Sequence, residues 1–165
     1  AKALGATVIG TVGSPAKAEL ARAHGCDHVI NYASENFTQR VRDITGGKGV
    51  AVVYDGVGKD TFTGSLDSLR PMGMMVSYGN ASGPVPPVDL ILLSQKGSLF
   101  ITRPTLMTYT AQRADLLELG RELFDRVASG QLRIEVNQRY ALRDAAQAHR
   151  DLEARKTTGS TILLP

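Results

Sequence analysis

This sequence lacks the residues that several kinds of functional site require. The 165 residues include a single cysteine, Cys26, which excludes a disulfide framework and a zinc finger within the chain. The same scarcity agrees with the reducing cytoplasm that we predict as its compartment. Lysine and arginine are scattered without interleaved aromatics, so the net charge of +3 does not indicate a nucleic-acid partner. No apolar run approaches the roughly 20 residues of a membrane-spanning helix.

Catalytic patterns are absent as well. His24, His28 and His149 lie within helical or strand patterns, which is typical of structural or surface positions. We find no Ser/His/Asp set, no Cys/His pair and no support for metal catalysis. Asp55 could be a catalytic acid, but its place before a glycine favours a turn-capping role. We therefore predict no metal site and name no catalytic residue.

A strand followed at once by a helix is indicated near the start of the chain. The residues from Thr7 to Val12 are mostly β-branched, as in a buried strand. Gly13 permits a sharp turn, Ser14 can cap a helix, and Pro15 suits the first helical position. Lys17 then falls in the first helical turn, near the carboxyl end of the strand, where α/β sheets bind ligands.

An acidic residue is missing from this segment, and its absence bears on the choice of nucleotide. NAD-binding Rossmann folds hold the ribose hydroxyls with an Asp or Glu at the end of the second strand. Here the hydroxyl of Ser14 and the cation of Lys17 occupy the region instead, which suits the 2′-phosphate of NADP(H). The alternative interpretation is a capped helix with a solvated lysine.

Strand and helix patterns alternate along much of the chain. The sequence predicts strands at residues 7–12, 28–32, 50–54, 74–78, 98–103, 132–136 and 161–164. Helices are expected at residues 16–24, 89–95, 110–129 and 144–155, after a cap at Ser34, and around Phe62, Leu66 and Leu69. The strand at 50–54 is apolar throughout, which indicates a central position in the sheet. Alternation of this kind predicts βαβ units and a parallel sheet.

Glycines mark the ends of three predicted strands. They are Gly13, then Gly56 with Gly58, then Gly79. Because the carboxyl ends of parallel strands meet at one edge, and glycine lets a ligand approach the backbone closely, these turns predict a ligand groove.

Five motifs occur in the order and spacing of a known family. They are Ile-Gly-Thr-Val-Gly-Ser-Pro-Ala-Lys at 9–17, Val-Ile-Asn-Tyr at 29–32, Val-Tyr-Asp-Gly-Val-Gly at 53–58, Val-Ser-Tyr-Gly-Asn at 76–80 and Thr-Thr-Gly-Ser at 157–160. Over all 165 residues the chain resembles the NADPH:quinone oxidoreductases, the zeta-crystallin-like branch of the medium-chain dehydrogenase/reductases.

The resemblance implies an α/β fold with a Rossmann-type, doubly wound parallel sheet that lacks its first strand and its Gly-rich turn. Residues 1–130 would form this partial nucleotide-binding domain. Residues 131–165 would pack back on an N-terminal GroES-like catalytic domain that is absent. Because residues 1–6 resemble the last turn of a helix, we expect the chain to be a piece of a longer protein. Because the first strand and the Gly-rich turn would hold the pyrophosphate, we expect the chain to be inactive alone.

The implied activity is hydride transfer from NADPH to a quinone or a related conjugated carbonyl compound such as an enone. One alternative is a non-catalytic nucleotide-binding or structural module, since some relatives are lens proteins or bind RNA. Another is a methyltransferase that uses S-adenosylmethionine. Ser14 and Lys17 argue against the methyltransferase, because that cofactor has no 2′-phosphate.

Cofactor-binding residues follow from the resemblance at the predicted strand ends. Gly13, Ser14 and Lys17 match the site of the 2′-phosphate. Tyr32 matches the aromatic residue beside that phosphate or the adenine; alternatively, it is a strand-end tyrosine with a hydrated hydroxyl.

The remaining matches lie farther along the chain. Val57 and Gly58 match the turn beneath the adenosine ribose and pyrophosphate. The segment beside the nicotinamide ribose is matched by Tyr78, Gly79 and Asn80. Arg155 matches a late arginine that reaches the cofactor, although an arginine there would also stabilise the end of a helix.

A protein partner is also expected. The strand that begins at Ser98 and ends at Arg103 is the last parallel strand and so lies at a sheet edge. Its apolar residues Leu99, Phe100 and Ile101 favour pairing with another chain, and in the family this strand pairs across a two-fold axis. We therefore predict a homodimer through this edge.

Overall fold

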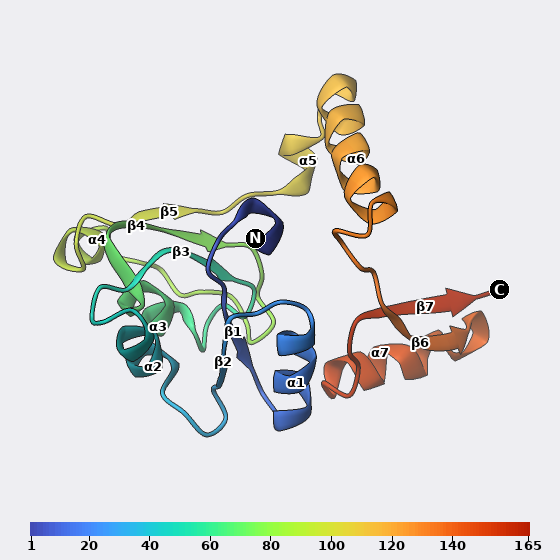
Figure 1. Cartoon of the computed structure of the whole chain (residues 1–165), viewed down its shortest axis with the longest axis horizontal. Coiled ribbons are helices and arrows are strands. Elements are labelled where there is room, and N and C mark those ends of the chain that lie inside the picture. The colour runs from blue at the N-terminus through green and yellow to red at the C-terminus, as the bar shows by residue number, and fades with distance from the viewer. The chain divides into compact units, whose positions relative to one another are not determined.

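A computed structural model describes all 165 residues (Figure 1). They form two compact units, residues 1–111 and residues 112–165. None of the helices combines the length and apolar character needed to cross a membrane. The predicted division into residues 1–130 and 131–165 concerns the domains of a longer protein and stays a prediction.

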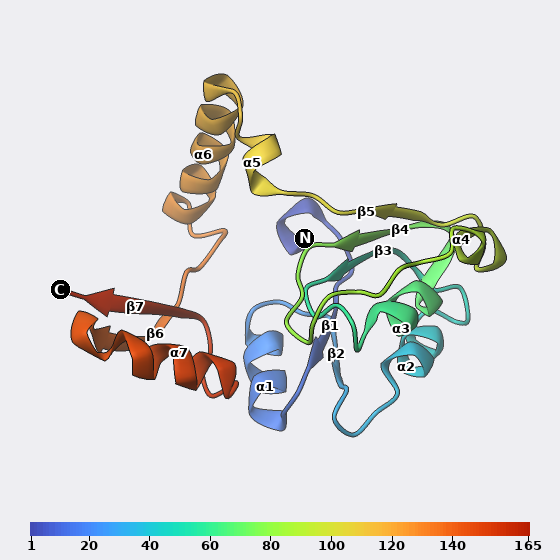
Figure 2. The same ribbon diagram turned by 180° about the vertical axis from the view of Figure 1, so that it is seen from behind.

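The first unit contains two parallel sheets joined by helical crossovers (Figures 1 and 2). One sheet pairs β1 (Ile9–Val12) with β2 (His28–Asn31). The other has the order β3 (Val50–Asp55), β4 (Leu69–Ser77), β5 (Phe100–Thr102). The helices of this unit are α1 (Pro15–Ala23), α2 (Phe37–Ile44), α3 (Phe62–Asp67), α4 (Ile91–Gln95) and α5 (Leu106–Tyr109), after a 3₁₀ turn, η1 (Lys2–Leu4). Parallel strands with helical crossovers confirm the predicted α/β class.

The two sheets are not paired with each other. A Rossmann sheet in the order 3-2-1-4-5-6 would place its first strand between β1 and β3, so the break lies where the resemblance expects a strand to be missing. As a result β3, which the sequence indicated as a central strand, is an edge strand of its sheet. Its Val52 and Tyr54 are exposed, Tyr54 by 72%.

The core of the first unit lies between the three-stranded sheet and α3. Its buried members are Phe62, Leu66, Leu69, Met75 and Leu99. Full burial of one such side chain contributes about 1.5–3 kcal/mol. Leu69 belongs to β4 and not to the helix in which its spacing placed it, because α3 already ends at Asp67.

Two further expectations about the first unit are wrong. The cap of α2 is Asn36, whose side-chain oxygen accepts a hydrogen bond from the N–H of Gln39 at 3.1 Å. Ser34 instead lies in the preceding turn, where its hydroxyl donates to the carbonyl oxygen of Asn31. At the edge strand, Leu99 is buried in the core, which leaves Phe100 as the exposed apolar residue at 56%.

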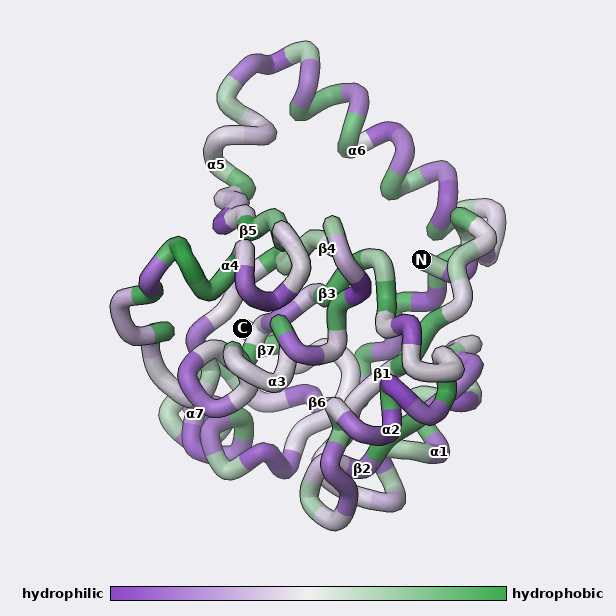
Figure 3. Tube along the Cα trace, turned by 90° about the vertical axis from the view of Figure 1, so that its left-hand side faces the viewer, coloured by the Kyte–Doolittle hydropathy of each residue, from purple (hydrophilic) through white to green (hydrophobic).

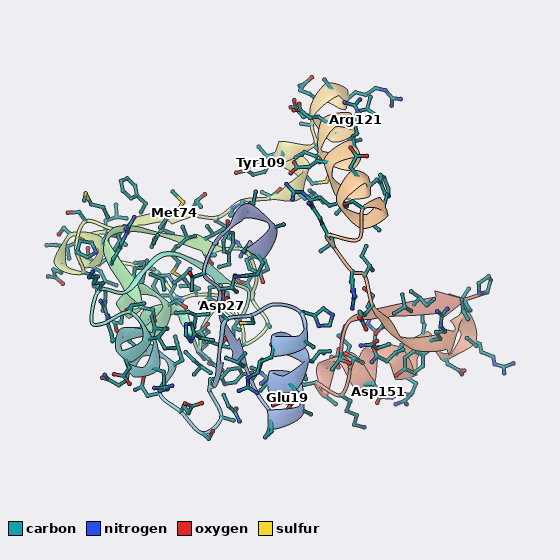
Figure 4. All side chains as sticks on the ribbon, in the orientation of Figure 1. Glu19, Asp27, Met74, Tyr109, Arg121 and Asp151 are labelled. Atoms are coloured by element: carbon teal, nitrogen blue, oxygen red, sulfur yellow. The ribbon has the colours of Figure 1, made fainter.

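The second unit holds α6 (Arg113–Ala128), β6 (Val136–Ala141), η2 (Leu142–Asp144), α7 (Ala145–Glu153) and β7 (Ser160–Leu164). β6 and β7 are parallel, and α7 connects them. Asp151 lies on α7, where Figure 4 labels it. Its carboxylate accepts hydrogen bonds from the Tyr140 hydroxyl at 3.0 Å and from the Gln147 amide at 3.0 Å. The bond from Tyr140 ties the helix to β6, whereas the bond from Gln147 lies within the helix. Leu132 and Ile134, expected in this strand, lie before it.

Hydrophobic and hydrophilic residues alternate along helix α6 (Figure 3). It begins at Arg113 rather than at residue 110, because a separate short helix, α5, precedes it. Leu116, Leu119 and Leu123, which follow one another at helical spacing, are exposed. No residue of α6 is buried, so this helix receives little of the packing that normally stabilises helices.

Candidate functional site

The carboxyl end of β1 brings four predicted residues together. Ser14 caps α1, and its hydroxyl oxygen accepts a hydrogen bond from the N–H of Lys17 at 3.4 Å. Lys17 is half-buried in the first turn of the helix. Tyr32, just after β2, lies across Gly13, because a Cβ on this glycine would be 2.9 Å from the tyrosine hydroxyl oxygen. A serine hydroxyl and a lysine residue lie together in the first turn of a helix here, and such a combination is favourable for a phosphate.

The end of β3 is organised by a buried carboxylate. Oδ1 of Asp55 accepts hydrogen bonds from the N–H groups of Val57 at 2.8 Å and Gly58 at 2.9 Å. Its Oδ2 accepts from the hydroxyls of Thr61 at 2.8 Å and Ser65 at 2.7 Å. Burial raises the pKa of this carboxyl, but these hydrogen bonds outweigh burial and hold the pKa below its ordinary value. Asp55 therefore caps the turn, as its sequence context favoured.

This capping limits what Val57 and Gly58 can do for a ligand. Their N–H groups point at the Asp55 carboxylate, and the next N–H, of Lys59, donates to the carbonyl oxygen of Gly83 at 3.1 Å. None of these three groups is available to a pyrophosphate. The turn can touch a nucleotide through its exposed surface but does not supply an anion-binding nest.

The loop after β4 is packed backbone to backbone on this turn. The N–H of Tyr78 donates to the Asp55 carbonyl oxygen at 2.9 Å. A Cβ on Gly79 would lie 2.2 Å from the Gly56 carbonyl oxygen, and one on Gly58 would lie 2.6 Å from that of Gly83. Gly58 also has φ +91°. These two glycines are therefore required by contacts within the protein, whereas the sequence suggested a ligand as the reason.

The side chains of this loop lie at the surface. Tyr78 is 58% exposed, and a Cβ on Gly56 would lie 2.8 Å from its hydroxyl oxygen. Asn80 is exposed. Nine of the predicted cofactor residues thus lie at the carboxyl ends of β1 to β4. Arg155 follows α7 in the second unit, and its role stays a prediction.

One residue of this edge was not identified from the sequence. Arg103 follows β5, and its Nη1 donates to the carbonyl oxygens of Ser77 at 2.8 Å and Gly79 at 3.4 Å. Its partners are more than twenty residues away in sequence, so local pattern carries no signal for them. The only available hint was an arginine at the end of a strand on the ligand edge.

A model of the zinc-binding dehydrogenases matches residues 24–163. The chain belongs to the zinc-binding dehydrogenase family. One relative, a quinone oxidoreductase of Pseudomonas aeruginosa, is 56% identical to this chain over 100% of the chain and 51% of the relative. A 2-haloacrylate reductase of Burkholderia sp is 52% identical over 100% of the chain and 50% of the relative. The chain thus spans about half the length of the curated relatives it matches.

Solved structures agree with the sequence matches. The Escherichia coli quinone oxidoreductase complexed with NADPH has a TM-score of 0.96 and 51% identity, covering 99% of this chain and 51% of that one. These matches confirm the resemblance of this family member to the quinone oxidoreductases.

The family is named for zinc binding, but the side chains of this chain that could ligate a metal are not arranged to hold a zinc ion. No group of three or more His, Cys, Asp or Glu residues could hold a metal ion. Cys26, for example, donates its thiol hydrogen to the carbonyl oxygen of His28 at 3.0 Å.

Proposed function

We propose that the protein containing this chain is an oxidoreductase that transfers hydride from NADPH to a quinone or a related conjugated carbonyl compound. The observation that carries this proposal is that Ser14 and Lys17 lie together at the start of α1, directly after β1, and that no carboxylate takes their place. We call this proposed phosphate-binding position the seat. NADPH supplies the hydride when bound. Within the full-length protein, the role of this chain is to hold the nucleotide along the carboxyl ends of its strands.

Charge is the physical basis of the cofactor choice. A 2′-phosphate would accept hydrogen bonds from the Lys17 ammonium and the Ser14 hydroxyl, and the N-terminus of α1 favours a negative charge. NADH has an uncharged hydroxyl at this position and gains little from the same groups. Tyr32, at 39% exposure, offers a ring beside the seat for the adenine.

The relatives support the choice of acceptor class. One is named for quinones and another for 2-haloacrylate, and both compounds are electron-poor conjugated systems that can accept hydride. None of the relatives named here favours the non-catalytic alternative or the methyltransferase. A cytoplasmic location stays a prediction from the single cysteine.

The test is an assay of the full-length protein. We expect oxidation of NADPH, followed by its absorbance, to depend on an added soluble quinone and to be much slower with NADH. A parallel assay uses 2-chloroacrylate as the acceptor. Activity with 2-chloroacrylate alone would move the substrate class to unsaturated acids. Absence of NADPH oxidation with every conjugated acceptor would contradict the proposal.

We also propose a homodimer through β5. The strand lies at the edge of its sheet, and Phe100 is 56% exposed, which favours pairing with a second copy. Phe100→Lys is expected to convert the full-length protein from dimer to monomer in light scattering at micromolar concentration. Phe100→Leu keeps the apolar edge and should remain dimeric. A wild-type monomer would contradict this assembly.

A further inference from the structure

The segment Tyr78 to Asn80, here called the β4 loop, is held firmly on the side of β3. The N–H groups of Tyr78 and Gly79 both point at the carbonyl oxygen of Asp55, at 2.9 Å and 3.4 Å. A side chain at Gly79 would collide with the backbone of Gly56. The β4 loop therefore has little freedom to shift toward β3.

Arg103 holds the same loop from the side of β5. The backbone pairing of β4 with β5 ends at Val76 and Thr102. Pro104 follows soon after and has no N–H to donate, so the ladder cannot continue. Nη1 of Arg103 supplies a donor at this point, 2.8 Å from the Ser77 carbonyl oxygen and 3.4 Å from that of Gly79.

The position of the β4 loop identifies the part of the cofactor that it would meet. Ligands of open α/β sheets lie across the carboxyl ends of the strands. If the 2′-phosphate is held by Lys17 at the end of β1, a dinucleotide that crosses this edge brings its other half to β3 and β4. The nicotinamide half then lies against Tyr78, Gly79 and Asn80.

We propose that Arg103 is a positioning residue for the nicotinamide half of the cofactor, acting through the backbone of the β4 loop. This inference rests on the proposed function. Arginine suits the task because its planar guanidinium presents several donors in a rigid fork, and one of its nitrogens reaches two carbonyl oxygens here. Without it the carbonyl oxygen of Ser77, a buried residue, loses its donor, and the loop is no longer held on the side of β5.

The experiment compares two ligands in the full-length protein. NADPH occupies the whole site, whereas 2′,5′-ADP carries the adenosine and its 2′-phosphate but no nicotinamide. Arg103→Gln is expected to weaken NADPH binding about tenfold, as loss of a charge-assisted hydrogen bond does. Binding of 2′,5′-ADP should stay within about twofold, since its contacts lie at a distant strand end. Both dissociation constants are measured by calorimetric titration.

Two further variants separate positioning from general damage. Arg103→Lys retains the charge and one donor group, and it should recover part of the NADPH affinity. Arg70→Gln removes an exposed arginine at the amino end of β4, the strand that precedes the β4 loop, and should leave both affinities unchanged. Thermal melts of each variant test whether the fold is retained.

The outcomes are distinct. Equal weakening of both ligands by Arg103→Gln, or no weakening of NADPH, would overturn the positioning role while the proposed cofactor survives. Failure of the wild type to bind either ligand would overturn the proposed function, and this inference with it.

Discussion

Asp55→Ala is expected to lower the free energy of unfolding of the full-length protein by roughly 3 kcal/mol or more. The substitution leaves the N–H groups of Val57 and Gly58 and the hydroxyls of Thr61 and Ser65 without their shared acceptor. Buried donors without a partner cost about 1–3 kcal/mol each, although some regain water. Denaturant unfolding followed by circular dichroism measures the change.

Charge and geometry can be separated at this position. Asp55→Asn keeps an oxygen for the two N–H groups, and the hydroxyls of Thr61 and Ser65 can turn to accept from its amide. The stability loss should therefore be smaller. Asp60→Ala removes an exposed carboxylate of the same turn and should change stability by less than about 0.5 kcal/mol. A similar loss from Asp60→Ala would contradict the special role of Asp55.

Stability should also depend on pH through this carboxylate. Its pKa is lower in the folded protein than in the unfolded chain, so the folded state holds fewer protons. The stabilisation is complete above the unfolded pKa, about 3.9. It is lost as the pH falls from there through the folded pKa. Asp55→Asn should have a shallower acid dependence than the wild type, and identical profiles would disprove the assignment.

Lys17→Ala is expected to weaken NADPH binding by the full-length protein by about ten- to a hundredfold and to leave NADH binding nearly unchanged. The variant removes the ammonium that we place on the 2′-phosphate, a contact that NADH does not make. Melting temperatures with each nucleotide at matched concentrations measure the effect. A hundredfold excess over the dissociation constant stabilises the folded state by about 2.7 kcal/mol, so the wild-type shift with NADPH should be large.

A matched lysine serves as the control. Lys48 is exposed in the loop before β3, at the opposite end of the strands from the seat, and Lys48→Ala should bind NADPH as the wild type does. Raising the salt concentration should reduce the preference for NADPH in the wild type and have less effect in Lys17→Ala. Equal loss of affinity for NADPH and NADH in Lys17→Ala would argue against a phosphate contact.

Local signals predicted the first unit well where neighbouring residues make the contacts. Ser14 and Pro15 start α1 through a cap and a fixed φ, both of which act within one helical turn. The same logic misplaced the cap of α2, because Ser34 and Asn36 are both good caps and only the course of the chain selects between them. Leu69 was assigned to a helix because an apolar residue at helical spacing also fits the start of a buried strand.

The sequence by itself determined the α/β class, the family, and the start of a helix at Ser14 and Pro15 directly after a strand, because these depend on short-range pattern and on motif order. Only the tertiary structure decided that Asp55 engages the N–H groups of Val57 and Gly58 and that Gly79 faces the backbone of the neighbouring turn. The same holds for Arg103 and the β4 loop. These contacts join residues from different strands, whose hydrogen-bond partners are set by sheet register and packing, which no local pattern specifies.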